Sequence, residues 1–168
     1  FDKIKKKMNI NLDYFEFKND NNRIFNTLNL LSANNTNLQD IENYSTKIDF
    51  EHPIKWINLS YGGKLSFIKT QNNVDYFDTT TGIPIFDPTQ SNEFNYKENI
   101  QAIYLNGTKK LNEKWETQLG IRLENTQTEG FSKTLNQKNT NNYAKLFPTF
   151  YLTYTPNETN SFSINYNK

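Results

Sequence analysis

The chain contains no cysteine, a single histidine, and only six glycines and five prolines among its 168 residues. The lack of cysteine excludes disulfides, thiolate metal sites and cysteine nucleophiles. With His52 as the only histidine, paired-histidine metal motifs such as H-E-x-x-H are impossible. No catalytic residue, cofactor-binding residue or metal ligand set emerges from the sequence, and we expect neither an enzyme nor a bound cofactor.

The chain also lacks an excess of charge of one sign and a long apolar run. Nineteen lysines and arginines oppose eighteen aspartates and glutamates, so nothing electrostatic favours nucleic acid as a partner. No apolar stretch approaches the ~18 residues that a membrane-spanning helix requires. Segments with helical spacing of apolar residues are short. Helical membrane proteins and helical bundles are therefore disfavoured.

The chain is nevertheless rich in aromatic residues. Its mean hydropathy is −0.86, yet 15% of the residues are aromatic, with thirteen phenylalanines and ten tyrosines. A disordered chain shares the low hydropathy but lacks the aromatic side chains. The composition therefore indicates a folded protein in which large apolar groups alternate with polar ones.

Alternation with a period of two recurs along the chain and predicts β-strands. In the stretch KWETQLGIRLEN, one row is Trp115, Thr117, Leu119, Ile121 and Leu123 and the other is Glu116, Gln118, Gly120, Arg122 and Glu124. We predict an all-β fold of eight long antiparallel strands within one segment, residues 1–168, that holds no plug domain and no linker. The predicted strands are 4–17, 23–32, 44–52, 56–72, 95–108, 114–129, 143–155 and 160–168.

Tight and long connections alternate between these predicted strands. The tight ones are 18–22, 51–55, 109–114 and 155–160, and the long ones are 32–43, 74–95 and 131–142. An up-and-down meander with short turns at one end and long loops at the other is typical of outer-membrane β-barrels. A large soluble barrel would also alternate, and the pattern leaves that alternative open.

Three stretches resemble the outer-membrane β-barrel family of TonB-dependent receptors, of the kind abundant in Bacteroidetes. They are NEFNYKENIQAIY (92–104), WETQLGIRLENTQTEG (115–130) and YAKLFPTFYLTYTPNETNSFSINY (143–166). The recurrent features are F-x-Y-x-E-x-x-x-A-x-Y, G-x-R-x-E and L-F-P, in the same order and spacing. The chain lacks a plug-like segment and a recognisable TonB box, so the resemblance implies an internal section of barrel wall.

The resemblance also implies partners and a location. The expected partners are outer-membrane lipid, the remaining barrel strands, a plug domain and, indirectly, TonB, and the expected location is the outer membrane of a Gram-negative bacterium. On this interpretation the lumen is lined by Glu116, Gln118, Arg122 and Glu124. The residues that face lipid or its interface are Trp115, Leu119, Ile121 and Leu123.

Several other residues invite a functional interpretation. The Gly62-Gly63-Lys64 stretch does not match a phosphate-binding loop, because Leu65 replaces the required hydroxyl residue, and two glycines within a strand favour a bulge or bend. His52 precedes Pro53 and is expected in a tight turn. Glu98 falls on an apolar row, either above the hydrocarbon or turned inward by a bulge near Asn99.

Four carboxylates share the predicted long loop between Val74 and Asn95: Asp75, Asp78, Asp87 and Glu93. Their spacing matches no EF-hand, and solvated loop acids are the more common case. The sequence therefore leads to two functional hypotheses. The first is a wall section of a TonB-dependent receptor, with long extracellular loops that contribute to substrate passage or binding. The alternative is a self-contained eight-stranded barrel, soluble or in the outer membrane, that binds a small ligand.

Overall fold

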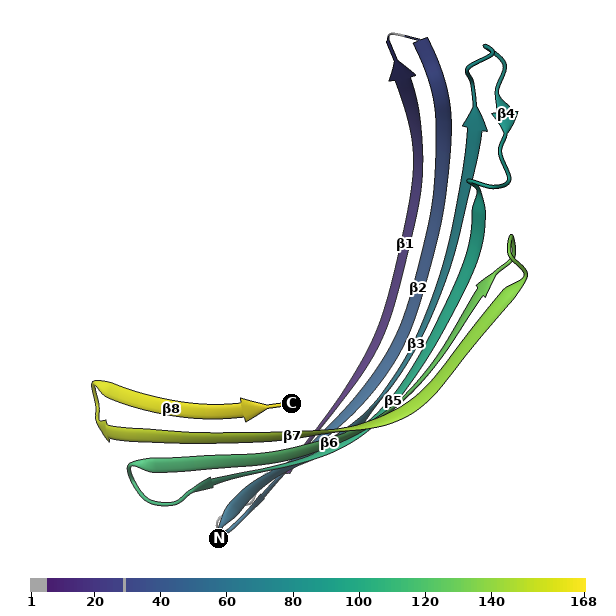
Figure 1. Cartoon of the computed structure of the whole chain (residues 1–168). Helices are drawn as coiled ribbons and strands as arrows, with labels where there is room; N and C mark the ends of the chain where they lie inside the picture. Colours follow the sequence, from purple (N-terminus) through teal and green to yellow (C-terminus); the bar gives the residue numbers. More distant parts are fainter. Residues whose placement is uncertain (1–5, 29) are drawn as a thin grey trace.

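The computed structural model describes residues 6–28 and 30–168 and consists of one curved, antiparallel sheet (Figure 1). Its strands are β1 (Lys7–Thr27), β2 (Leu30–Ile54), β3 (Ile57–Asp78), β4 (Ile85–Phe86), β5 (Asn92–Lys110), β6 (Trp115–Ser132), β7 (Gln137–Asn157) and β8 (Asn160–Asn167). Over these residues no helix is long and apolar enough to cross a membrane.

The strands follow one another as a meander, in the order β1-β2-β3-β5-β6-β7-β8, and the two-residue β4 pairs back onto β3. The expected all-β, up-and-down antiparallel meander of eight strands is thus confirmed. In the described residues β1 pairs only with β2 and β8 only with β7, so the sheet stays open at both edges. Because a barrel requires its first and last strands to pair, these residues do not close a barrel among themselves.

The connections differ from those expected. The predicted tight turn 18–22 lies inside β1, and the predicted long loop 32–43 lies inside β2, so 23–32 is not a strand of its own. Residues 4, 5 and 29 of the predicted strands lie outside the described residues. The predicted loop 131–142 is a short turn between β6 and β7, and 74–95 shrinks to 79–91. Polar Asn-rich segments suggest loops, yet here they form strand ends, because both faces of these ends are solvated and accept polar side chains.

Two turn predictions are also corrected. His52 does not lie in a turn, because β2 continues to Ile54 and His52 pairs with Leu59 of β3. The Gly62-Gly63 pair makes no bulge, since the register of β3 is continuous with both neighbouring strands through these residues. The turn itself is confined to Lys55 and Trp56.

The sheet separates side chains by chemistry onto two faces. Residues that pair directly across an antiparallel ladder project to the same side, so the register assigns every strand residue to one face. The following residues, the apolar belt, share one face: Met8, Ile10, Leu12, Tyr14, Tyr44, Ile48, Phe50, Leu59, Tyr61, Leu65, Phe67, Ile103, Leu105, Trp115, Leu119, Ile121, Leu123, Leu146, Pro148, Phe150, Leu152, Tyr154, Phe162, Ile164 and Tyr166. The opposite face, at the same levels, is mainly polar.

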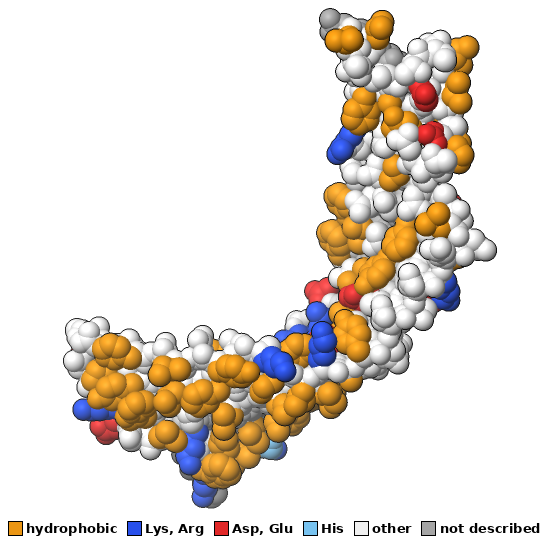
Figure 2. Space-filling model, viewed as in Figure 1, with side chains coloured by type: hydrophobic (Ala, Val, Ile, Leu, Met, Phe, Trp, Pro, Cys, Tyr) orange, Lys and Arg blue, Asp and Glu red, His pale blue; other side chains and the backbone are white. Residues whose placement is uncertain are grey.

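The polar face is the concave one. Side chains on the inside of a curved sheet crowd together, whereas those on the outside splay apart and remain accessible. The buried strand residues all lie on the polar face: Ala33, Ser66, Ala102, Thr126 and Ser132. The belt residues Leu119 and Ile164, in contrast, are 61% and 69% exposed. The protein therefore presents its apolar side chains outward on the convex face, where Figure 2 shows them gathered over the lower arm of the molecule.

The upper border of the apolar belt crosses the strands obliquely. On β7 the belt ends at Leu146, which the strand pairs in between place level with Ile48 on β2. On β2 the belt continues four residues further, to Tyr44. Four residues correspond to about 13 Å along a strand, and the four inter-strand steps from β2 to β7 correspond to about 19 Å across the sheet. The border is therefore inclined by about 35° from the perpendicular to the strands. Strands of membrane barrels tilt by about 35–45° relative to the barrel axis, so the border matches a horizontal membrane surface.

Candidate functional site: the concave wall

The concave face carries a group of polar side chains on β2, β5 and β6, at two adjacent levels of the sheet. We call it the inner cluster; its members are Lys47, Asp49, Tyr104, Arg122 and Glu124. Asp49, Gly62, Tyr104 and Arg122 are successive partners across the sheet, so they form one transverse row. The next row contains Lys47, Lys64, Ala102, Glu124 and Lys145. The cluster thus exists only because the register brings four strands level.

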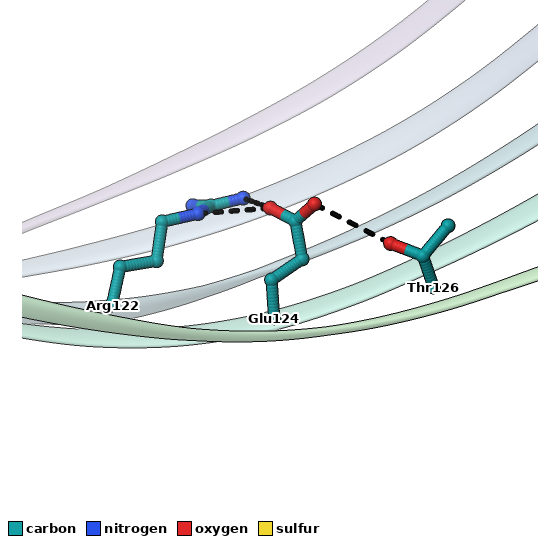
Figure 3. Close-up of polar contacts among 3 residues, drawn as sticks. All are labelled: Arg122, Glu124 and Thr126. Carbon is teal, nitrogen blue, oxygen red and sulfur yellow. Dashed lines mark hydrogen bonds and ion pairs between the residues drawn. The ribbon is translucent and has the colours of Figure 1, made fainter. Parts of the chain in front are cut away.

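Arg122 and Glu124 are bound to each other along β6 (Figure 3). Both Nε and Nη2 of Arg122 donate to Oε2 of Glu124, at 3.1 and 2.7 Å, and the Thr126 hydroxyl donates to Oε1 at 3.4 Å. The two charged side chains are 32% and 22% exposed. Such partly shielded charges are held in one geometry by mutual hydrogen bonds, which gives this wall a fixed pattern of charge.

Asp49 accepts two partners from different strands. Lys47 Nζ lies 3.0 Å from Oδ2, and the Tyr104 hydroxyl, from β5, donates to Oδ1. The Lys47 ammonium also lies 5.7 Å from the centre of the Tyr104 ring. Tyr104 reaches across β3 to make this contact, and it can do so because residue 62, which lies between, has no side chain.

The residues singled out on β6 from the sequence divide between the two faces of the strand, and their contact with a lumen or with lipid stays a prediction. Glu116, Gln118, Arg122 and Glu124 lie on the concave face, and Trp115, Leu119, Ile121 and Leu123 lie on the convex face. At the lower rim Trp115 stacks on Tyr154, with ring centroids 4.4 Å apart. Nothing in the sequence indicates a role for Asp49, and the pattern marks Gly62 only as a bulge or bend. The contact that joins both residues to Tyr104 could not be predicted without the register.

Glu98 lies on the concave face, so the expectation that its row faces lipid is wrong, and the inward placement needs no bulge. Glu98 pairs with Thr128 of β6. Thr128 is an even number of residues from Glu124 and Arg122 on the same strand, so Glu98 shares the concave face with these two residues. The register of β5 shows no shift, and the suggested bulge near Asn99 is absent. The row containing Glu98 reads as apolar because aromatic residues lie on the concave face there. One of them, Tyr96, donates its hydroxyl to Glu98 Oε2 at 2.6 Å.

The loop carboxylates organise turns. Asp78 accepts from the Thr80 amide and hydroxyl at 2.8 and 2.7 Å, and Asp87 accepts from Thr89 in the same way at 2.8 and 2.6 Å. These hydrogen bonds hold the pKa of both carboxyls below the ordinary value. Across residues 6–28 and 30–168 no group of three or more acidic or histidine side chains is arranged to hold a metal ion.

Comparison with known proteins places this geometry in a family. The family model described as "Outer membrane protein beta-barrel family" matches residues 1–168. No curated protein matches the sequence. The ferric citrate transporter FecA in its unliganded form is similar in structure, with a TM-score of 0.73 and 12% identity over 95% of this chain and 24% of that one.

Two further solved structures show the same fold. The ferric yersiniabactin uptake receptor FyuA from Yersinia pestis has a TM-score of 0.64 and 15% identity, over 90% of this chain and 24% of that one. The siderophore receptor PiuA from Acinetobacter baumannii has a TM-score of 0.68 and 14% identity, over 96% of this chain and 29% of that one. The chain thus spans only about a quarter of the length of these structures.

The family match confirms the expected outer-membrane β-barrel family, and the three solved structures share the fold of this chain. The three similar structures are described as transporters or receptors, and none is described as an enzyme. The apolar belt, its oblique border and the polar concave wall are the features that a barrel wall in the outer membrane requires. The chain belongs to the outer membrane β-barrel family and is a protein of the Gram-negative outer membrane.

Proposed function

We propose that these residues form a section of the barrel wall of an outer-membrane transport receptor. The observation that supports this most is the division of one continuous sheet into an outward apolar belt and an inward polar wall. A bilayer offers no hydrogen bonds to the backbone, so a wall of paired strands with apolar groups outside is the stable way to cross it. In this proposal the single segment 1–168 supplies strands of the wall.

In this proposal the belt spans the hydrocarbon. On β2 the span from Tyr44 to Ile54, which lies on the same face as the belt, covers ten residue steps, about 33 Å along the strand and about 27 Å along the membrane normal at the tilt derived above. The apolar band of outer-membrane barrels is about 25 Å tall. Trp115 and its stacking partner Tyr154 then sit at one interface, and the paired rings of Tyr14 and Tyr44, 4.9 Å apart, sit at the other.

The inner cluster would face the lumen. Its charges are partnered within the wall, so it offers a plug domain or a passing substrate a polar surface without requiring either to neutralise a buried charge. The work of energy coupling by TonB would fall to other segments of such a receptor. The upper halves of β1, β2 and β3, which extend beyond the belt, would project toward the exterior and meet substrate there.

The open edges favour a wall section over a self-contained barrel for a small ligand. The long edge of β1 and the edge of β8 leave backbone groups unpaired, and exposed edges of this length invite pairing with further strands. We propose that neighbouring strands of a larger barrel satisfy them. A pairing of β1 with β8 in the membrane-inserted protein, measured by cross-linking of cysteines placed on the two strands, would instead support the self-contained barrel.

Single-cysteine labelling tests the two faces directly, because residues 1–168 contain no cysteine that must be removed. Gln118→Cys and Leu119→Cys place the probe on opposite faces at one level. In proteoliposomes, a fluorophore on residue 119 is expected to be quenched by spin-labelled lipid, and one on residue 118 by a water-soluble quencher. Equal quenching of both probes by the aqueous agent would contradict the proposal.

A further inference from the structure

A pocket lies at the outer end of the concave face, beyond the level of the apolar belt. Its volume is about 420 Å³, and the residues that line it include Phe25, Ala33, Tyr76, Asp78 and Gln90. Phe25, Ala33 and Asp78 are successive partners across β1, β2 and β3, so they form one transverse row. Ala33 is 4% exposed and forms the floor, with an aromatic side chain on one side and a carboxylate on the other. Tyr76, two residues before Asp78 on β3, adds a second ring from the adjacent row.

A β-bulge beside Phe25 ties this end of the sheet to the loop 79–91. The register of β1 and β2 shifts between Phe25 and Asn26, and Ser32 is the residue of β2 that the ladder leaves without a partner. The Ser32 hydroxyl donates to the Phe25 carbonyl at 3.0 Å, and the Ser32 carbonyl accepts from the Thr79 amide at 3.2 Å. Bulges redirect side chains and are frequent beside functional sites. The bulge therefore holds the backbone of Phe25 in a fixed position relative to the loop.

The end of the loop holds the opposite wall of the pocket. The Ser91 hydroxyl accepts from the Tyr76 amide at 2.9 Å and donates to the Asp87 carbonyl at 2.7 Å. On Asp78 both hydrogen bonds from Thr80 go to the same oxygen, Oδ1. The other oxygen, Oδ2, accepts no hydrogen bond from the described residues. The pocket is thus held from both sides and keeps one carboxylate oxygen free for a ligand.

Negative charge predominates at this end of the sheet. Residues 19–38 and 73–91 contain four acidic side chains and one basic one: Asp20, Asp75, Asp78, Asp87 and Arg23. Asp78 is the one charged residue among those that line the pocket. Arg23 shares the concave face but lies on β1, two strands away from Asp78. A cation in the pocket would therefore lie nearest to Asp78 and would be attracted by the acidic end as a whole.

A carboxylate beside aromatic rings is an arrangement that binds organic cations. The electron-rich faces of the rings attract a cation, and the carboxylate supplies the opposite formal charge. A metal ion is a poorer fit, because the described part of the chain contains no group of three or more acidic or histidine side chains arranged around one point. A sugar is the other ligand that aromatic rings and carboxylates accept, so the experiment below includes one.

We propose that this pocket binds a small organic cation, with its ammonium group at Asp78 and its apolar substituents against Phe25 and Tyr76. The inference rests on the proposed function and deepens it, because it assigns a chemical class of ligand to the end of the wall that would project to the exterior. It makes the outer end of β1, β2 and β3 a determinant of what the receptor takes up.

The first test compares two probes of the same shape. Choline carries a quaternary ammonium group, and 3,3-dimethyl-1-butanol replaces its nitrogen with carbon and has no charge. Saturation-transfer NMR measures their dissociation constants on the protein with its whole natural chain, in a non-ionic polyoxyethylene detergent. We expect choline to bind about fivefold more tightly than the alcohol and glucose not to compete. Equal binding of the two probes, or displacement of choline by glucose, overturns the inference.

Variants then locate the binding. Phe25→Leu removes one ring, keeps every charge and every hydrogen bond of the loop, and should weaken choline binding about threefold. Asp78→Asn should weaken it about fivefold. The matched control Asp75→Asn removes the same charge from the convex face of the same strand and should leave choline binding unchanged. Unchanged affinity in Phe25→Leu, or equal losses in the two aspartate variants, contradicts the inference.

The two proposals fail in different ways. A protein whose faces label as expected in proteoliposomes, but which binds choline no better than the alcohol, refutes the cation site alone. A protein whose probes at residues 118 and 119 are equally quenched by the aqueous agent refutes the wall section, whatever it binds. Circular dichroism reports folding in every sample, and Phe25→Leu keeps the result independent of the loop turn that Asp78 also holds.

Discussion

Tyr104 occupies the space that a side chain at Gly62 would need. A Cβ on Gly62 would lie 2.5 Å from the Tyr104 hydroxyl oxygen and 2.8 Å from its Cζ, and it would also collide with the Ile48 carbonyl oxygen. Because the tyrosine crosses the glycine, its hydroxyl reaches Asp49 on the far strand. A glycine, a tyrosine and a carboxylate on three strands thus depend on one another.

Substitution of Gly62 is therefore expected to destabilise the wall. Gly62→Ala should cost about 1–3 kcal/mol, because overpacking forces a rotamer change or a backbone shift. Urea titration of the protein in lipid vesicles, followed by tryptophan fluorescence, measures the loss. The control is Gly63→Ala, whose Cβ meets only one carbonyl oxygen and should cost much less. Equal losses of unfolding free energy in the two variants would show that Tyr104 does not restrict the side chain at residue 62.

The Arg122–Glu124 pair should behave as a coupled unit. Removing one partner leaves the other partly shielded charge without its hydrogen bonds, so Arg122→Met and Glu124→Gln are each expected to destabilise by about 1 kcal/mol. The double variant should lose less than the sum. A double-mutant cycle of unfolding free energies checks this, and strict additivity would mean that the contact contributes nothing measurable.

Charge on the two faces of β6 should have opposite consequences. Leu119 lies at the middle of the belt on β6, where an arginine facing lipid costs about 2–4 kcal/mol. Leu119→Arg is therefore expected to reduce folding into vesicles strongly. The matched change Gln118→Arg, on the concave face one residue away, should be nearly neutral. Folding yields of the two variants, read from electrophoretic mobility without heating, decide between lipid and water at each face; similar yields would contradict the assignment.

The loop 79–91 should lose order in acid. The pKa values of Asp78 and Asp87 are lowered by hydrogen bonds that the ionised carboxylates accept from turn residues. A lowered folded-state pKa means that the stabilisation is present above the ordinary value of 3.8 and is lost as the pH falls through the folded pKa. The protection factors of the loop amides, which correct hydrogen exchange for its intrinsic pH dependence, are expected to fall below that range and to stay constant between pH 5 and 8.

A variant isolates the cause of this pH dependence. Asp87→Asn should raise exchange at the Thr89 amide at neutral pH, since the amide side chain is a weaker acceptor than the carboxylate. Asp20→Asn on β1 removes the same charge and forms none of these loop hydrogen bonds, so it serves as the control. If acid left the protection factors of the loop amides unchanged, the two carboxylates would not be holding its turns.

The alternation on β6 could be read correctly from the sequence because every second residue there has the same chemistry. The same reasoning failed on β5, where Tyr96, Ala102 and Tyr104 lie on the concave face beside Glu98 and made a polar wall look apolar. It failed again at 18–22 and 32–43, where asparagines suggested turns. Strand ends beyond the belt have water on both faces, and their side chains carry no alternating signal.

The sequence by itself determined that this protein is an all-β meander with one apolar and one polar side, since alternation and aromatic content are local properties of the chain. The tertiary structure alone decided which strands are level with which. That register joins Asp49, Gly62 and Tyr104 across the concave wall, places Asp78 level with Phe25 at its outer end, and gives the belt its oblique border. These relationships depend on pairing between residues tens of positions apart, and a shift of one residue would exchange the faces of an entire strand.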